Sequence, residues 1–497
     1  MRRRPFGHLR SRGKDAGGEL RRDFLHAHFN TFGDAFLDLR FQIATLLLLL
    51  LLLAVYFVVM IAAGKHCGPV SPLMGWLVGL GYFTVAPLAL ITLHGGYRLP
   101  ELFEVGASWG EVDLSSARFF FPYLTVWVSL MGALAMVAMF LPRARPADWW
   151  RDIDVGLLQK GMAASIAMMF AGWALMVWLV GGLQEFLVSH WYSRAEELVA
   201  RHGDLFVLWN HLTQANAIVF SSAAVLHSAT GIFRRQMRWR FTFLIWLILL
   251  LEVVVSGNRI FLAIYLLAVV VTLAFERRWR VFAALLALAP VLVFVFSMWS
   301  SVRHNLAELG KSSSAYLEGD SRDDLMSSLI NVTEGMNVLL LLHIVDDYGT
   351  RADYLHGLTY ARAAISLVPR QLLPAKPHNF TALMAERYLP NVETSLNATA
   401  IGEMYANFGP LTLFLFPVLT GAIIALSQWS CGGAERHPLV HVILFVVLLW
   451  AARSTLEDNF VLFLLCFFLL RLFRIERRLT ARNRCEAGNG NLAKATI

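Results

Sequence analysis

The sequence predicts an all-α fold, a polytopic bundle of about 11 transmembrane helices with one large external loop region near the C-terminal third. Three observations predict it. The 497 residues are 57% hydrophobic and 16% charged, with a mean hydropathy of +0.57, which exceeds the range of soluble domains. Continuous apolar runs recur along the chain and do not alternate as barrel strands do. Arginines cluster beside these runs, a topology pattern that argues against a nucleic-acid partner.

The individual spans follow from the apolar runs, each long enough to cross most of a bilayer. The run at 213–231 carries several polar residues, so it is either a span that faces the protein interior or a surface helix, and the span is favoured. The candidate spans are 43–63, 73–93, 119–141, 161–181, 213–231, 241–256, 259–275, 281–299, 411–427, 438–452 and 459–475.

Charge and composition divide the chain into segments. A basic tail (1–42) precedes a bundle (43–299) that contains an external loop at 182–212. A large external region (300–410) is followed by C-terminal helices (411–475) and a basic cytoplasmic tail (476–497). Within the external region, Met336 to Val345 is apolar but too short to span, so it lies at the interface or packs on the bundle.

Arginine-rich loops at 234–240 and 277–280 indicate cytoplasmic turns, which places the tip of the 241–275 hairpin outside. Counting back from these loops puts the basic N-terminus outside, which the same rule forbids. One span within 40–141 is therefore missing, re-entrant or wrongly drawn.

Neither a metal site nor a cofactor site is predicted. The four cysteines are scattered, and the chain has no HExxH pattern and no clustered histidines and cysteines. It also lacks Walker A and Rossmann glycine patterns. Energy for any synthetic reaction would then come from an activated donor carried in the membrane.

The stretch 365–421 gathers the candidate chemistry. Three prolines within 369–377 break helices and predict a shaped loop. Its cations, Arg370 and Lys376, suit a diphosphate or anchor the loop at the interface. Glu403 precedes the span at 411, where a carboxylate is costly unless it is paired, so it pairs with a cation or acts as a base. His378 is a second candidate base.

Two further arginines come from distant turns. Arg259 follows Ser-Gly-Asn between two spans and is either a snorkelling interfacial residue or a cation held at the external mouth of the bundle. Arg453 precedes Glu457 and Asp458 in the turn between the last two spans. We expect both arginines on the same face as the 370–405 stretch, so that they form one composite site.

The order of these signals resembles bacterial oligosaccharide repeat unit polymerases, the Wzy-type O-antigen and exopolysaccharide polymerases. The resemblance covers about residues 120 to 475. It departs at Asn258-Arg259-Ile260, where the family often has Ser-Arg-Gly, so the arginine is kept and only the turn geometry differs. The matching pieces are GGLQEF with Arg194, SGNRIFLAIYLL, YLHGLTYARAAISLVPRQLLPAKP, TAIGEMYANFGPLTLFLFPVLTG and Arg453.

The resemblance implies inverting, metal-independent glycosyl transfer at the periplasmic face of the bacterial inner membrane. The growing glycan on undecaprenyl diphosphate would be the donor and one lipid-linked repeat unit the acceptor, with a chain-length regulator and a flippase as pathway partners. Arginine cations would stabilise the departing diphosphate. The expected catalytic residues are Arg259, Arg370 and Glu403, and the expected substrate-binding residues are Arg194, Tyr360, Lys376, His378, Tyr405, Asn407 and Arg453.

Two other functions stay open. An O-antigen ligase shares the donor and a periplasmic loop but transfers the glycan to lipid A–core. A transporter or flippase for a lipid-linked glycan would show two related halves with broken helices and ionisable groups at mid-bilayer. No such halves are visible, and the polar residues gather at one face.

Overall fold

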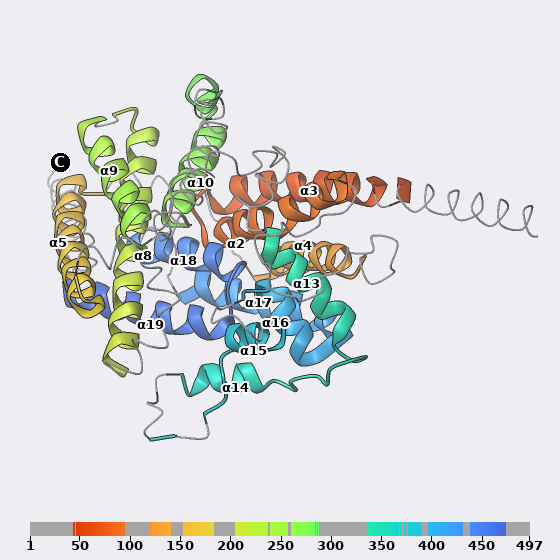
Figure 1. Cartoon of the computed structure of the whole chain (residues 1–497). Coiled ribbons are helices and arrows are strands. Elements are labelled where there is room, and N and C mark those ends of the chain that lie inside the picture. The colour runs from red at the N-terminus through yellow and green to blue at the C-terminus, as the bar shows by residue number, and fades with distance from the viewer. Residues whose placement is uncertain are drawn as a thin grey trace, which may run out of the picture.

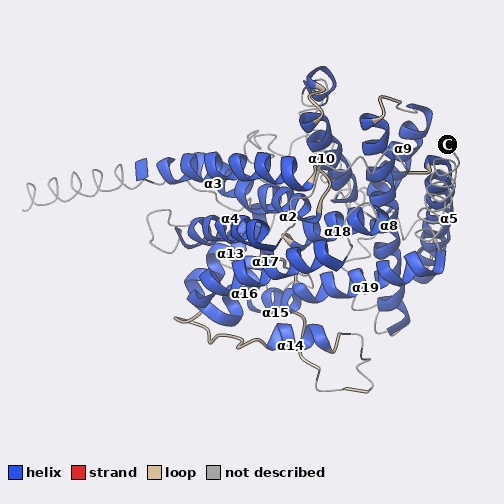
Figure 2. Cartoon of the chain, turned by 180° about the vertical axis from the view of Figure 1, so that it is seen from behind, coloured by secondary structure: helices blue, strands red, loops and turns tan. Residues whose placement is uncertain are grey.

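The computed structural model is predominantly helical, and the described residues contain turns and loops but no strand (Figure 2). They are 43–44, 46–94, 120–140, 153–182, 204–236, 239–256, 260–283, 285, 287, 335–366, 368, 372–373, 376–388, 396–430 and 438–473. The helices pack side by side in a bundle, with α14 and α15 along its lower edge in Figure 1. This arrangement confirms the all-α class.

Five helices in the described residues are long and apolar enough to cross a membrane. Shorter apolar helices cover Phe121–Gly132, Ile260–Phe275, Pro438–Ala451 and Asn459–Leu469. Length and composition are therefore those of a membrane protein, while the larger predicted span count stays a prediction. The five helices are Leu46–Cys67, Pro72–Leu93, Val155–Val180, Leu208–Phe233 and Thr399–Ser427.

The helices follow the predicted spans closely in most places. The predicted span 281–299 falls mostly outside the described residues. The first half of the bundle comprises α2 (Pro72–Leu80), η1 (Gly81–Val85, a π-helical turn), α3 (Ala86–His94), α4 (Phe120–Phe140), α5 (Val155–Val180), α8 (Asp204–Phe233), α9 (Trp239–Ser256) and α10 (Ile260–Phe275). The second half comprises α13 (Gly335–Asp347), α14 (Leu358–Ala364), α15 (Phe380–Tyr388), α16 (Thr399–Phe408), η4 (Gly409–Leu411), α17 (Thr412–Ser430), α18 (Pro438–Ala451) and α19 (Leu456–Phe473).

Helix α8 lies in the interior of the bundle, against α5, α10, α18 and α19. Some of its polar side chains find partners there: Asn216 and Ser165 are joined by a hydrogen bond of 2.7 Å, and Ser228 and Tyr265 by one of 2.8 Å. The predicted span at 213–231 is thus a helix that faces the protein interior. It begins at Asp204, so residues 204–212 of the predicted external loop are helical.

Helices α2 and α18 approach each other at two glycines. A Cβ atom on Gly75 would lie 2.1 Å from the Phe445 carbonyl oxygen, and one on Gly79 would lie 2.3 Å from the Leu449 carbonyl oxygen. Only glycine permits this contact between backbones. The spacing of four residues is the small-residue pattern of membrane helix pairs, and it is the sequence signal that indicates this packing.

The described part of the predicted external region is a layer of short helices on the bundle. Helix α13 contains the apolar stretch 336–345 and packs against α16, α3 and α4, with nearly all of its apolar residues buried. Helix α16 continues through η4 into α17, so the layer is joined directly to a candidate span. The layer and α17 together form the surroundings of the candidate site.

Candidate functional site

A cavity of about 240 Å³ lies where the short helices meet α17, α18 and α19. Its walls inside the bundle are apolar, and its polar residues gather mostly where α14, α16 and the start of α19 meet. The cavity is therefore amphiphilic along its length. The apolar lining includes Trp76, Phe416, Leu419, Ile423, Ile424, Leu444, Val447, Leu448, Phe460 and Phe463, and the polar lining consists of Tyr360, Glu403, Thr420, Ser427, Ser454 and Asn459.

Glu403 lies at the polar end of the cavity and is 1% exposed. Its Oε2 atom accepts a hydrogen bond of 2.8 Å from the backbone N–H of Leu456, the first residue of α19. The first N–H groups of a helix have no partner within the helix and carry partial positive charge. The sequence reading offered pairing with a cation or a role as a base, and the structure adds a helix terminus as a partner for this carboxylate.

Asn407 lies one turn after Glu403 and is fully buried. Its Nδ2 group donates to Thr359 Oγ1 at 2.8 Å and to the Glu403 carbonyl oxygen at 2.7 Å. The backbone N–H of Leu355 donates to the Ala406 carbonyl oxygen at 2.9 Å, and His356 donates likewise to Asn407. These bonds fix α14 against the end of α16.

Tyr360 is held by that contact at the edge of the cavity, where its ring lies 5.5 Å from the Phe408 ring between centroids. Burial raises the pKa of its phenol well above the ordinary value, and the charge of Glu403 raises it further. Tyr360 therefore stays neutral and can donate a hydrogen bond to a ligand. Tyr405, by contrast, is buried in the core, with its ring 4.6 Å from Phe121 of α4.

Asn459 and Ser454 line the cavity and were not among the residues expected from the sequence. Asn459 Nδ2 donates to Ser454 Oγ at 3.0 Å and to the Thr455 carbonyl oxygen at 2.6 Å. Its Oδ1 atom is buried and accepts no hydrogen bond in the described part of the chain. Periodicity along α19 does not mark this face, because every turn of that helix carries apolar residues.

Arg453 lies in the turn before α19, and its guanidinium carbon is 5.6 Å from the centre of the Trp450 ring. The Phe261 ring, in the first turn of α10, lies 5.3 Å from the same tryptophan. The start of α10 and the Arg453 turn thus lie at one end of the bundle. The bond between Glu403 and Leu456 fixes the residues that follow Arg453.

Two described cations in and beside the proline-rich loop, Lys376 and Arg362, bind carbonyl oxygens of the chain itself. Lys376 Nζ donates to the carbonyl oxygens of Ser366, at 2.6 Å, and Val368, at 3.1 Å. Arg362 is nearly buried and donates to the Pro377 carbonyl oxygen. His378 is exposed to solvent. Both bonded cations shape the loop, and Arg362 had no assigned role in the sequence reading.

Three predicted site residues, Arg194, Arg259 and Arg370, lie outside the described residues. Arg259 directly precedes α10 in the sequence, and its predicted approach to the 370–405 stretch stays a prediction. Among described residues, no three histidine, cysteine, aspartate or glutamate side chains are close enough to hold a metal ion.

The short-helix layer carries a cluster of ion pairs. Asp347 forms ion pairs with Arg351 at 3.3 Å and with Arg387 at 3.5 Å.

Of the described candidates, Glu403 and Tyr360 line the cavity. Asn407 is bonded to the Glu403 carbonyl oxygen beside it, and Arg453 lies in the turn that leads into α19. Tyr405, Lys376 and His378 do not line the cavity. No protein-family model, curated protein or solved structure matches this chain.

Proposed function

We propose that this protein is a membrane glycosyltransferase that polymerises oligosaccharide repeat units carried on undecaprenyl diphosphate. The transfer takes place at the outer face of the bacterial inner membrane and needs no metal or cofactor. A growing glycan is moved from its lipid carrier to one incoming lipid-linked unit. Two observations support the proposal: the order of motifs in the sequence and the amphiphilic lining of the cavity.

The observation that carries the proposal is the amphiphilic cavity at the junction of α16, α17, α18 and α19. A polyprenyl-linked glycan is itself an amphiphile with a long apolar chain and a polar head. Apolar residues of α17 and of the shorter apolar helices α18 and α19 suit the chain. The polar end at Glu403 and Tyr360 suits sugar hydroxyls. At about 240 Å³ the cavity accommodates the first isoprene units next to the head, and the remaining chain would extend into the bilayer.

In the proposed reaction, a hydroxyl of the acceptor sugar attacks the anomeric carbon of the donor glycan. The new glycosidic bond forms as the bond to the diphosphate oxygen breaks, and the diphosphate leaves with the electron pair. The acceptor proton goes to a carboxylate or to water. Cations that are preorganised at the leaving oxygen supply most of the stabilisation.

Arg453 is the described cation best suited to this role, with Arg259 and Arg370 as further cations. Its guanidinium lies over the Trp450 ring, and the Phe261 ring at the start of α10 packs against the same tryptophan. A diphosphate next to Glu403 itself would meet like charge. We therefore assign Glu403 and Asn459 to sugar hydroxyls and Arg453 to the diphosphate.

The test is reconstitution of the purified full chain in vesicles with lipid-linked repeat units, followed by gel separation of the glycans. A polymerase yields a ladder of lengthening chains. Arg453→Ala is expected to lower chain growth about 10²-fold or more, the typical loss when one preorganised transition-state donor is removed. Arg351→Ala, a change at an exposed arginine on the short-helix layer, serves as the matched control and keeps the ladder.

The alternatives give different products in the same vesicles. Transfer of glycan only to added lipid A–core indicates a ligase. Movement of the lipid-linked unit across the bilayer without any new glycosidic bond indicates a transporter. Chain growth that EDTA abolishes and Mg²⁺ restores would overturn the metal-independent mechanism.

A further inference from the structure

A second amphiphilic feature lies far from the cavity in the sequence, where α8 ends, α9 begins and α10 ends. Helices α9 and α10 form a hairpin with a short connection, so the start of α9 and the end of α10 lie at the same end. Both are in the upper part of Figure 1. In the described residues 234–236, 239–240 and 276–280 of this end, one acidic residue, Glu276, accompanies six arginines: Arg234, Arg235, Arg240, Arg277, Arg278 and Arg280.

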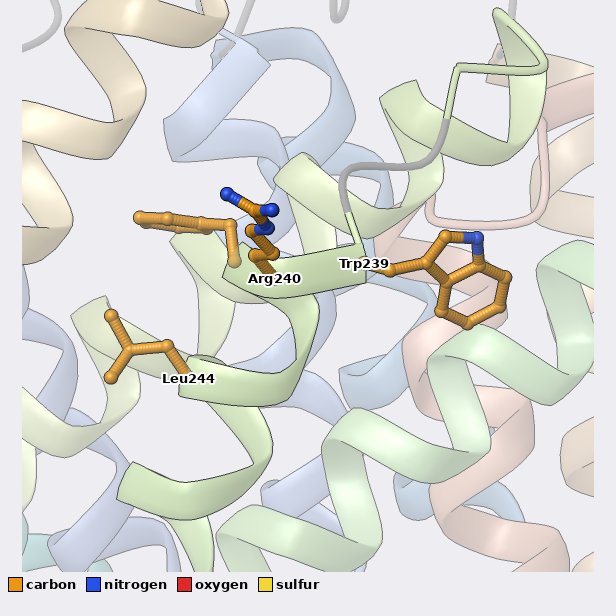
Figure 3. A pocket seen from close by; sticks show the side chains of 4 residues that line it. Trp239, Arg240 and Leu244 are labelled. Atoms are coloured by element: carbon orange, nitrogen blue, oxygen red, sulfur yellow. The ribbon is translucent and has the colours of Figure 1, made fainter.

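A hollow of about 480 Å³ opens beside the first turns of α9 and is lined by Trp239, Arg240, Phe241 and Leu244 (Figure 3). Arg240 and Leu244 are four residues apart and therefore lie on one face of the helix. Figure 3 shows both side chains on the same side of α9, with Arg240 nearer the start of the helix. Trp239 points to the other side.

The face that begins at Arg240 changes from charged to apolar along the helix. Leu244 is 38% exposed and Leu247, on the next turn of the same face, is 43% exposed. Leu247 lies seven positions after Arg240 on the helix, a rise of about 10 Å. This distance matches the depth over which a lipid passes from its headgroup to its acyl chains.

Arg240 is a cation without a described acidic neighbour in an ion pair. No ion pair joins it to an acidic side chain in the part of the chain that the structure describes, and its side chain is exposed. Arg240 lies at one end of the apolar face formed by Leu244 and Leu247. This arrangement fits a ligand with a negatively charged headgroup and an apolar chain. The second tryptophan–arginine pair, Trp279-Arg280, repeats the arrangement after α10, with Trp279 59% exposed.

We propose that the start of α9 binds an anionic phospholipid of the surrounding leaflet. Its phosphate lies on Arg240, and one acyl chain lies along Leu244 and Leu247. Trp239 sits at headgroup depth, where indole rings are favoured. This site is independent of the proposed glycosyl transfer, and it fixes the depth and tilt of the α9–α10 hairpin in the bilayer.

The test measures lipid retention by the full chain in native mass spectrometry, after transfer from vesicles into detergent. Two vesicle types with identical acyl chains are compared, one containing phosphatidylglycerol and one pure phosphatidylcholine. The wild type is expected to keep phosphatidylglycerol selectively. Arg240→Ala lowers the apparent affinity about fivefold, the usual effect of one arginine near an anionic surface. Arg240→Lys is expected to keep most of the apparent affinity for phosphatidylglycerol.

The control variant is Arg351→Ala, whose side chain is 74% exposed on the short-helix layer and which leaves retention unchanged. Leu244→Gln tests the apolar face on which the acyl chain lies. It is expected to weaken retention of phosphatidylglycerol although Arg240 is kept, so the proposal does not depend on one variant. Equal retention of the two lipids by the wild type overturns the proposal. Wild-type retention by both Arg240→Ala and Leu244→Gln overturns it as well. Competition by inorganic phosphate would identify a free-anion site instead, and a doubled mass would identify a contact between two copies.

Discussion

The two sides of α18 differ in how much room they leave. On one side, Gly75 and Gly79 bring α2 so close that its backbone touches the backbone of α18. On the other side, α17 and α19 stand off and leave a cavity of about 240 Å³ between apolar side chains. A single helix therefore forms both a close backbone-to-backbone contact and one wall of the candidate site.

This contrast indicates how the bundle keeps a cavity without losing its form. Close backbone packing fixes α18 in position, so the opposite side does not need to be filled to hold the helix in place. The polar end is fixed separately, because Glu403 joins α16 to the start of α19. The four predictions that follow test this division, beginning with the largest expected effect.

Gly79→Leu should break the contact between α2 and α18. The Cβ atom would lie 2.3 Å from the Leu449 carbonyl oxygen, and backbone cannot move aside as a side chain can. We expect a loss of more than about 3 kcal/mol in the free energy of unfolding. The loss of stability is measured by thermal unfolding in detergent and by the yield of monodisperse protein.

The matched control is Gly68→Asn, just before α2. No atom lies within 4 Å of a Cβ built there, and asparagine tolerates the left-handed backbone of this position. We expect its melting temperature to stay close to the wild-type value. A wild-type melting temperature for Gly79→Leu would show that α2 and α18 are not in close contact.

Glu403→Ala should loosen the polar end of the cavity. The change leaves the partly buried Leu456 N–H without its carboxylate partner, and we expect a cost of about 2 kcal/mol. Glu403→Gln keeps an acceptor oxygen and should recover most of the melting temperature. If Glu403 also acts as a base, chain growth by the glutamine variant fails although its stability returns. Equal stability of the alanine variant and the wild type would refute the helix-terminus role.

Ile424→Phe should fill the cavity and leave the fold intact. Ile424 is 3% exposed and lines the cavity, whereas Leu426, two residues later on α17, is 60% exposed and points away. We expect chain growth to fall about tenfold for Ile424→Phe, a typical loss of apolar binding, with a melting temperature at or above the wild-type value. Leu426→Phe is the matched control. Similar activities for the two variants would exclude the cavity from substrate binding.

The smallest effect concerns His343 on α13, the helix that supports α16 from behind. Burial lowers the pKa of His343 below 6.5, although Asp347 and Asp346 partly oppose the shift. Below that pH the unfolded chain binds the proton more readily than the folded chain, so stability falls as the pH is lowered. We expect the melting temperature to drop between about pH 7.5 and about pH 5.5, and His343→Gln to reduce the slope. A steeper slope in the variant would contradict this assignment.

Much of the bundle could be predicted from the sequence. The spans predicted at 241–256 and 259–275 agree within two residues with α9 (Trp239–Ser256) and α10 (Ile260–Phe275). Apolar length alone sets these bounds, because the bilayer fixes how long an apolar helix must be. The polar residues of α8 are costly against lipid, which favoured an interior-facing span over the surface helix that the sequence also allowed.

The candidate site was less predictable. Glu403 was singled out because a carboxylate near a membrane needs a partner, yet its partner is a backbone N–H 53 residues away. No local pattern encodes that contact. Asn459 was missed because sequence periodicity does not reveal which face of an apolar helix borders empty space. Lys376 was expected at a ligand, and the carbonyl oxygens to which it donates carry no signature in the sequence.

The π-helical turn at Gly81–Val85 has a consequence for the whole assembly. One additional residue in a helical turn rotates everything after it by about 100° around the axis. The continuous helix Pro72–Leu93 can thus present its first half to α18 inside the bundle and its second half to α13 in the short-helix layer. The turn rotates the second packing surface of the helix relative to the first. Shortening it by one residue would therefore turn the face that packs against the short-helix layer away from that layer.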